Sequence, residues 1–459
     1  MRKVFVGEKS ERIRLFSMEA PHMRTFHITW MSFLVCFFAW FAIAPLMAVV
    51  REEFHLTKSQ IGNIIIASVS ITMFGRILVG WLCDKIGPRL TYTGLLLLGA
   101  IPVICIGFAH SYETFLVFRL SIGIIGASFV ITQYHTSSMF APKVVGSANA
   151  IAAGWGNLGG GLAQIIMPLF FAFFIGWGVS PHLAWRYSMI IPGALMLLMG
   201  ILYYRFTQDT PEGNILELKT KVKAQGNEKK IDLKTVLTDY RVWILFLIYG
   251  CSFGLEITID NIAALYFIDK FGVSLALAGL LAGTFGGMNL FARALGGLFS
   301  DVANKRFGLK GRTVILGAFL FLEGVGVMIF SNIDLLVWSV ISMLLFALFV
   351  KMSNGACYAV VPYINKKALG MVAGIVGAGG NVGAILMGFV FKMQGFTYQT
   401  GLFLIAFFIV LVSLTAFFIT PLFGTRNARE LSPAYVSISS GRDNLENNMV
   451  IDRLDQVTD

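Results

Sequence analysis

The sequence predicts an all-α, polytopic membrane protein in which twelve transmembrane helices form two pseudo-symmetric bundles of six. The first observation behind this prediction is composition: 56% of the 459 residues are hydrophobic and 13% are charged, whereas roughly 25% of the residues in a soluble domain are charged. The second is an internal repeat. Arginine, glycine and aspartate stand four residues apart from Arg76 onward, and the same triplet recurs from Arg293 onward, about half a chain length later. Such duplication is typical of transporters built from two parallel repeats.

Twelve apolar segments are long enough to cross a bilayer, because one crossing takes ~20 apolar residues. They cover residues 26–49, 59–82, 90–109, 114–139, 146–175, 186–206, 243–267, 274–300, 313–331, 334–361, 368–393 and 400–421. The only long polar break, 208–240, is rich in lysine and divides the segments six and six. We therefore expect an N-terminal segment 1–25, a bundle 26–207, a linker 208–240, a bundle 241–423 and a disordered tail 424–459.

The basic residues predict the orientation of the chain. Lysine and arginine gather before the first segment, in the linker and in alternate loops, while the loops 110–114 and 331–334 carry none. By the positive-inside rule, both termini and the linker are cytoplasmic and the chain spans an inner or plasma membrane. The net charge of +11 then reflects topology and not nucleic-acid binding. The five cysteines lie in or at the edges of the segments, as small buried hydrophobes do, and imply no disulfide framework.

Arg76 and Arg293 are the strongest candidates for a binding site. An arginine at the centre of a membrane costs roughly 2.5 to 3.5 kcal/mol on insertion scales, so it faces a partner or a polar cavity. One partner would be an acid, Glu256 or Asp260. Neither acid has a counterpart in the first half of the chain, whereas the arginines are a matched pair, which favours an anionic ligand. The planar guanidinium fork suits a planar oxyanion such as nitrate or a carboxylate.

Two further repeats flank the arginines. The sequence GASF, ending at Phe129, is echoed by GACY, ending at Tyr358, and these aromatics would form the walls of a site for a flat ligand or would only pack. GNLG and GNVG place Asn157 and Asn381 in two glycine-rich segments. Each amide would bond a ligand or a neighbouring helix, and the glycines would allow close helix packing. The glycines concerned are Gly154, Gly156, Gly159, Gly377, Gly380 and Gly383.

Importing an anion against a negative-inside potential requires a co-transported cation. Glu256 and His135 are the candidates for a proton-coupling group, because each places a protonatable side chain inside a predicted span. Either side chain could instead be hydrogen-bonded in the bundle without carrying a proton.

These motifs resemble a known family. Gly80, Asp84, Lys85, Gly87 and Arg89 are similar to the cytoplasmic loop motif of the major facilitator superfamily, and Asp301 lies in a degraded second copy. AAGWGNLGGG and GAGGNVGA resemble the paired signatures of the nitrate/nitrite porter family. QYHTSSMFAPKVVGSANA, FGLEITIDNIAALYF and VVPYINKKALGMVAGIVGAGG look like its assimilatory nitrate transporter branch.

The resemblance implies alternating access by two bundles, with nitrate held between Arg76 and Arg293. It further implies that Phe129 is the aromatic flanking the substrate and that Asn157 is the signature asparagine. This chain departs from the family pattern in its short linker and tail relative to eukaryotic members, and in His135, where an aromatic is expected.

The function predicted from these observations is a monomeric secondary transporter that imports nitrate by proton symport, with nitrite as a second candidate substrate. The first alternative is a nitrate/nitrite antiporter. The others are a nitrate sensor that binds without transport and a carrier of small carboxylates. Nitrate, protons and the lipid bilayer are the expected partners; no enzyme activity, cofactor, metal site or nucleic-acid partner is expected.

Overall fold

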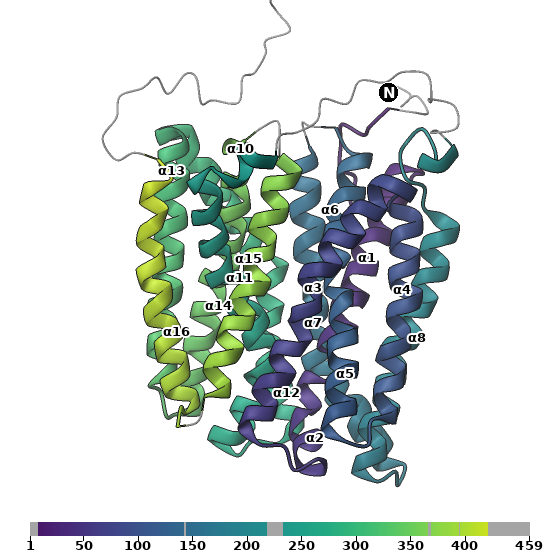
Figure 1. Ribbon diagram of the computed structural model, residues 1–459, viewed down its shortest axis with the longest axis vertical. Coiled ribbons are helices and arrows are strands. Elements are labelled where there is room, and N and C mark those ends of the chain that lie inside the picture. The colour runs from purple at the N-terminus through teal and green to yellow at the C-terminus, as the bar shows by residue number, and fades with distance from the viewer. Residues whose placement is uncertain (1–7, 142–143, 218–232, 366–368, 394, 421–459) are drawn as a thin grey trace, which may run out of the picture.

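The computed structural model describes residues 8–141, 144–217, 233–365, 369–393 and 395–420, and these residues are helical apart from turns, short connections and two isolated bridges. The predicted tail, 424–459, and the middle of the predicted linker, 218–232, lie outside the described residues. In Figure 1 the long helices run side by side, with the earlier part of the chain on one side and the later part on the other.

The first bundle contains six crossings. They are built from α1 (His22–Phe41), α2 (Met47–Glu53), α3 (Lys58–Ile86), α4 (Pro88–Cys105), α5 (Tyr112–Ile122), α6 (Ser128–Met139), α7 (Val145–Gly176) and α8 (Pro181–Phe206). The 3-10 segment Ala44–Leu46 joins α1 to α2, and Gly123–Ala127 joins α5 to α6, so each of these pairs makes one crossing.

The second bundle follows the short helix α10 (Leu233–Leu237). Its helices are α11 (Tyr240–Phe271), α12 (Leu275–Gly287), α13 (Ala292–Ser331), α14 (Leu336–Val360), α15 (Leu369–Lys392) and α16 (Tyr398–Ser413). A 3-10 segment, Met288–Leu290, joins α12 to α13 and ends three residues before Arg293.

The described residues contain 11 stretches long and apolar enough to cross a membrane, and one of them is two crossings. Leu275–Ser331 holds 57 residues, which at ~1.5 Å per residue is more than twice the ~30 Å hydrocarbon core. The chain turns back at Gly308, where φ is 62° and ψ is −154°, a conformation that glycine adopts without a Cβ clash. Gly311 consequently lies against the backbone of Ala303. The predicted twelve crossings are therefore confirmed.

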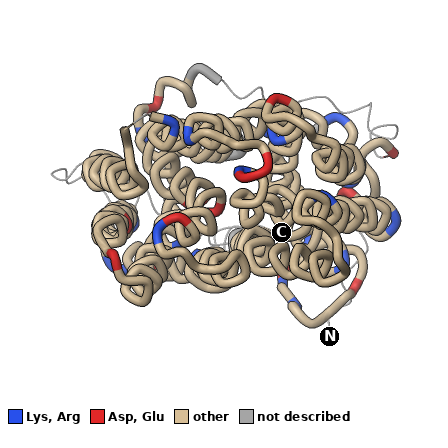
Figure 2. The backbone as a smooth tube through the Cα atoms, turned by 90° about the horizontal axis from the view of Figure 1, so that it is seen from below, with Lys and Arg blue, Asp and Glu red and all other residues tan. Residues whose placement is uncertain are grey.

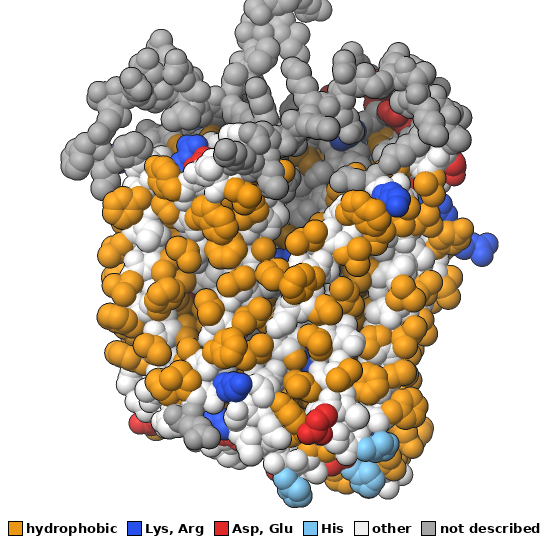
Figure 3. Space-filling view, in the orientation of Figure 1, with side chains coloured by type: hydrophobic (Ala, Val, Ile, Leu, Met, Phe, Trp, Pro, Cys, Tyr) orange, Lys and Arg blue, Asp and Glu red, His pale blue; other side chains and the backbone are white. Residues whose placement is uncertain are grey.

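Large apolar side chains cover the outside of both bundles, as a lipid-facing surface requires. Figure 3 shows hydrophobic side chains over the middle of the visible face. Phe74, Ile77 and Leu98 are among the large apolar side chains that are more than half exposed. Figure 2, which looks along the helices, shows that charged residues occupy only short stretches of the chain. This distribution makes the molecule a multi-pass membrane protein.

We call the two ends of the molecule the terminal side and the far side. The terminal side carries residues 8–20, residues 207–217 and α10, and the far side carries α2 and the turns at 272–274 and 332–335 (Figure 1). Between the bundles, the most extensive contacts join α3 to α15 and α7 to α12. We call the contact surface between the bundles the seam.

Candidate functional site

Arg76 lies in α3 and reaches across the seam. Its side chain is 7% exposed, and Nη1 donates a 2.6 Å hydrogen bond to the carbonyl oxygen of Gly377 in α15. Nε has no hydrogen-bond partner among the described residues. The guanidinium carbon lies 5.7 Å from the ring centroid of Phe129 and 5.9 Å from that of Phe253. Arg76 thus touches both bundles and keeps a buried N–H without an acceptor in the described part of the chain.

Arg293 follows the 3-10 segment before α13 and is 6% exposed. Its Nη2 donates to Oε2 of Glu256 at 2.9 Å, its Nε has no partner among the described residues, and its guanidinium carbon lies 5.7 Å from the ring centroid of Phe253. The salt bridge weighed above against ligand binding is therefore formed by Arg293. Arg76 has no carboxylate partner among the described side chains.

Phe253 was missed by the sequence reasoning, although both guanidinium groups lie over its ring. Its position one turn before Glu256 on α11 is the signal that could have found it, because residues three apart share a helix face. Tyr249, one turn earlier still, stacks on Phe253 with centroids 5.0 Å apart and planes at 12°. The sequence repeat could not indicate either residue because neither belongs to it.

The predicted aromatic pair does come together at the arginines. The ring centroids of Phe129 and Tyr358 lie 6.1 Å apart with planes at 71°, and Tyr358 meets Tyr249 edge-on at 5.0 Å. Aromatic side chains from both bundles therefore surround the two guanidinium groups.

Glu256 is the most heavily bonded side chain of the site. Besides Arg293, its carboxylate accepts from Nδ2 of Asn289 at 3.0 Å and from Nδ2 of Asn354 at 2.6 Å. The Nζ of Lys351 lies 2.7 Å from its Oε1, and Lys351 is fully buried. Two buried cations, Arg293 and Lys351, are therefore held at one carboxylate.

Asn157 is buried, and neither Nδ2 nor Oδ1 has a hydrogen-bond partner among the described residues. Gly154 and Gly161 face the second bundle, because a Cβ at either would contact the backbone of Asn289 or Gly286. Asn157 lies three residues after Gly154 and four before Gly161, so it shares the face of α7 that meets the second bundle. Its amide therefore points toward the seam.

Asn381 repeats this arrangement in α15. It is fully buried with both amide atoms unpartnered among the described residues. It lies four residues after Gly377, which contacts Arg76, and seven before Gly388, which contacts Ile66 of α3. We expected each asparagine to bond either a ligand or a neighbouring helix. Among the described residues, neither asparagine side chain bonds a neighbouring helix. A buried amide without a partner costs roughly 1–3 kcal/mol.

The signature glycines divide into two groups. Gly156, Gly159, Gly380 and Gly383 pack inside their own bundles: the first two lie against α1 and the other two against α11. A Cβ at Gly159 would overlap the Leu34 carbonyl, so the close approach of α7 to α1 depends on glycine. Gly154 and Gly377 instead face the opposite bundle, and Gly377 supplies the carbonyl that Arg76 binds.

His135 lies apart from the arginines, at the terminal end of the first bundle. It is fully buried, and its Nε2 lies 2.8 Å from the carbonyl oxygen of Gln208. Because a carbonyl only accepts, Nε2 carries the hydrogen, and Nδ1 of the neutral ring accepts from the Tyr203 hydroxyl at 2.5 Å. Both ring nitrogens are thus used in holding α6 to the end of α8.

The loop motif connects the terminal ends of α3, α4 and α8. Gly87 has a φ of 90°, and a Cβ there would overlap the carboxylate of Asp209. Asp209 accepts the backbone N–H of Arg89 at 2.7 Å and that of Ile215 at 2.9 Å. Burial raises the pKa of the Asp209 carboxyl, although these two bonds act in the opposite direction. The Arg89 side chain donates to the Tyr204 carbonyl at 2.6 and 2.8 Å.

The remaining motif residues lie near this connection or in its second copy. Among the described residues, a Cβ at Gly80 would come within 4 Å of Val130 alone, at 3.9 Å. The Nζ of Lys85 lies 4.5 Å from the ring centroid of Trp81. Asp301 pairs with Arg312 at 2.6 Å. The side chain of Asp84 is outside the described part of the chain. No group of three or more potential metal ligands occurs among the described residues.

Comparison with known proteins agrees with this architecture. The sequence model of the Major Facilitator Superfamily matches residues 29–388. The chain is 43% identical over 399 residues to the high affinity nitrate transporter 2.5 of Arabidopsis thaliana, covering 86% of this chain and 79% of that protein. It is 28% identical to the nitrate/nitrite transporter NrtP of Nostoc punctiforme, covering 83% and 89%.

Solved structures with the same fold include a bacterial homolog of the human lysosomal transporter Spinster, in an inward-facing and occupied conformation. Its TM-score is 0.67 at 15% identity, with 88% of this chain and 98% of that chain covered. The nucleoside transporter NupG gives a TM-score of 0.62 at 15% identity, covering 86% and 99%.

Proposed function

The chain belongs to the nitrate/nitrite porter family of the major facilitator superfamily, and we propose that it imports nitrate by alternating access, coupled to protons. The observation that carries this proposal is the convergence of Arg76 and Arg293, one from each half of the chain, over the ring of Phe253. An anion bound there contacts both bundles and therefore couples its binding to their movement.

The chemistry of the site suits nitrate. Nitrate is flat and carries its charge on three oxygens, which suits the planar N–H donors of two guanidinium groups and the aromatic rings beside them. Arg76 and Arg293 each keep a buried Nε–H without a protein acceptor, and Asn157 and Asn381 keep their amides. The assignment of Arg76, Arg293, Phe129 and Tyr358 to the substrate rests on this match.

Glu256 provides a route for proton coupling. Nitrate and the Glu256 carboxylate compete for Arg293, which the carboxylate holds at 2.9 Å. Two unit charges 4 Å apart interact by about 4 kcal/mol at an effective dielectric constant of 20. Protonating Glu256 removes this attraction and frees Arg293, and the charge of the arriving nitrate replaces the charge lost. Proton and nitrate therefore favour each other's binding.

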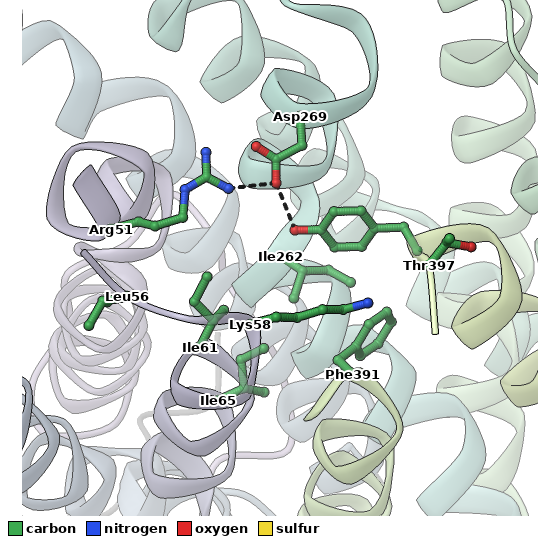
Figure 4. Close-up of a pocket in the computed structure, with 10 residues that line it drawn as sticks. Arg51, Leu56, Lys58, Ile61, Ile65, Ile262, Asp269, Phe391 and Thr397 are labelled. Atoms are coloured by element: carbon green, nitrogen blue, oxygen red, sulfur yellow. Dashed lines mark hydrogen bonds and ion pairs between the residues drawn. The ribbon is translucent and has the colours of Figure 1, made fainter. Parts of the chain in front are cut away.

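The far side of the seam is closed in this structure. Arg51 of the first bundle donates to Asp269 of the second at 2.7 Å, and Asp269 also accepts from the Tyr398 hydroxyl at 3.1 Å (Figure 4). These groups border a cavity of about 380 Å³. By the positive-inside rule we take the terminal side as cytoplasmic, so that the bundles 26–207 and 241–423 are closed toward the outside.

A nitrate/nitrite exchanger is the second candidate, and one observation favours it. The Glu256 carboxylate is bonded to Arg293, Lys351, Asn289 and Asn354, an environment that holds it ionised. A permanently charged Glu256 would not carry protons, and one anion would then leave as another arrives.

Uptake by purified protein in liposomes separates these functions. Nitrate uptake is measured with and without an inward proton gradient, and with nitrite inside or absent. Uptake that follows the gradient without internal nitrite supports symport, and uptake that needs internal nitrite supports exchange. Binding without uptake supports a sensor, and competition by small carboxylic acids supports a carboxylate carrier.

A further inference from the structure

Asp260 is a buried carboxyl group in the seam. It lies on α11, one turn from Glu256 toward the far side, and is 5% exposed. Its Oδ2 lies 3.5 Å from the position a Cβ would take at Gly160 of α7, and the Phe41 ring is 3.3 Å from the same position. Its backbone carbonyl accepts from Nε2 of Gln164 at 2.5 Å. Asp260 is therefore covered by the first bundle.

The surroundings of Asp260 contrast with those of Glu256. The Oδ1 of Asp260 has no hydrogen-bond partner among the described residues. The charged groups facing it are Glu256 on its own helix, Lys351 on α14 and Arg293 on α13. Both cations already pair with Glu256. The residues that cover Asp260 from α1 and α7 are uncharged: Phe41, Gly160 and Gln164.

Burial of an ionised carboxylate without a partner costs several kcal/mol, whereas a neutral carboxylic acid is buried at a far smaller cost. The cost arises when the first bundle closes over Asp260, because parting the bundles on the far side would expose the carboxylate to water. Closure on the far side is therefore favourable only when the carboxyl group carries a proton.

We propose that Asp260 is the group that loads the proton from the far side, and that its protonation is the condition for closing the far half of the seam. This rests on the proposed function, proton-coupled nitrate uptake, and names the residue that makes the coupling obligatory. Without a proton on Asp260, the bundles stay parted on the far side and nitrate is not carried inward.

Delivery of the proton takes one transfer toward the site. The O–H bond at Asp260 breaks and an O–H bond forms at Glu256, one turn away. The Lys351 ammonium, released from Glu256, then neutralises the Asp260 carboxylate, so the number of charges in the cluster is unchanged. Glu256 in its neutral form releases Arg293 to nitrate, which links the two carboxyl groups in one cycle.

Glu323 is a matched control in the same bundle. It is 0% exposed, and neither carboxyl oxygen has a hydrogen-bond partner among the described residues. Its carboxyl group faces Ser353, Lys351 and Glu256, all of which belong to the second bundle. Burial alone does not distinguish Glu323 from Asp260; position in the seam does.

The test compares Asp260→Asn with Glu323→Gln in liposomes. The asparagine amide imitates the protonated acid, so the far half of the seam is expected to close without a proton in Asp260→Asn. Exchange of labelled nitrate across the membrane should persist and become independent of pH between about 5.5 and 8, where exposed carboxyl groups stay ionised and so contribute no pH dependence. Accumulation driven by a proton gradient should be lost. Glu323→Gln should accumulate nitrate as the unsubstituted protein does. The proposal is overturned if Asp260→Asn still accumulates nitrate in response to the gradient. It is also overturned if Glu323→Gln loses this accumulation and Asp260→Asn does not.

A second measurement needs no change at Asp260. Ile61 lines the far-side cavity (Figure 4), and Ile61→Cys reports opening there through its labelling by a membrane-impermeant maleimide. After correction for the pH dependence of the thiol, labelling from the far side should slow as pH falls, because protonation closes the seam. A corrected rate independent of pH overturns the proposal. Absence of nitrate uptake by the unsubstituted protein would instead refute the proposed function.

Discussion

Replacing Arg76 by lysine tests whether the site reads a planar oxyanion or only negative charge. In the structure Nη1 is used by the Gly377 carbonyl at 2.6 Å, and the buried Nε–H is left for the ligand. A lysine keeps the charge but supplies a single nitrogen, so it cannot hold the Gly377 carbonyl and present a fork to nitrate together.

The expected loss is one charge-assisted hydrogen bond, worth roughly 1.5 to 3 kcal/mol. Since 1.4 kcal/mol is a factor of ten, the Kd for nitrate should rise roughly 10- to 150-fold. Isothermal titration calorimetry of the purified protein measures the Kd directly, and a thermal melt shows whether the variant is folded.

Arg312→Lys is the matched control. Arg312 is also buried, but it pairs with Asp301 at 2.6 Å, away from the aromatic site. Its Kd for nitrate should stay within about twofold of the unsubstituted protein, well under the 1.4 kcal/mol of a tenfold change. A folded Arg76→Lys variant that binds nitrate as tightly as this control would refute recognition of nitrate by the Arg76 guanidinium.

Three other predictions follow from the same contacts. Glu256→Gln removes the charge shared by Arg293 and Lys351; uptake driven by a proton gradient should be lost while labelled nitrate still exchanges, and gradient-driven uptake like that of the unsubstituted protein would contradict coupling through Glu256. Asn381→Ala should weaken nitrate binding by about 0.5 to 1.5 kcal/mol without lowering Tm, because no protein hydrogen bond is removed; a lower Tm with unchanged binding would make this asparagine structural. Gly159→Val should abolish uptake but not membrane insertion, since its side chain would overlap the α1 backbone; normal uptake would show that the close approach is dispensable.

Much of the fold could be predicted because its determinants are local. Apolar length and basic loops indicate the crossings without reference to any distant residue. The helix break at Gly308 was placed correctly between the predicted helices 274–300 and 313–331 because the intervening residues are polar and basic.

The sequence by itself determined the twelve crossings, the twofold repeat and the residues that the repeat contains, including the arginines and the pair Phe129 and Tyr358. Only the tertiary structure decided which partners these residues have. Arg76 binds a carbonyl 301 positions away, and Arg293 binds Glu256, a residue with no counterpart in the first half. The physical reason is that a helix forms from the residues of its own segment. The placement of Phe253 at two guanidinium groups, and of Asp260 against Gly160, instead depends on how the two bundles pack across the seam.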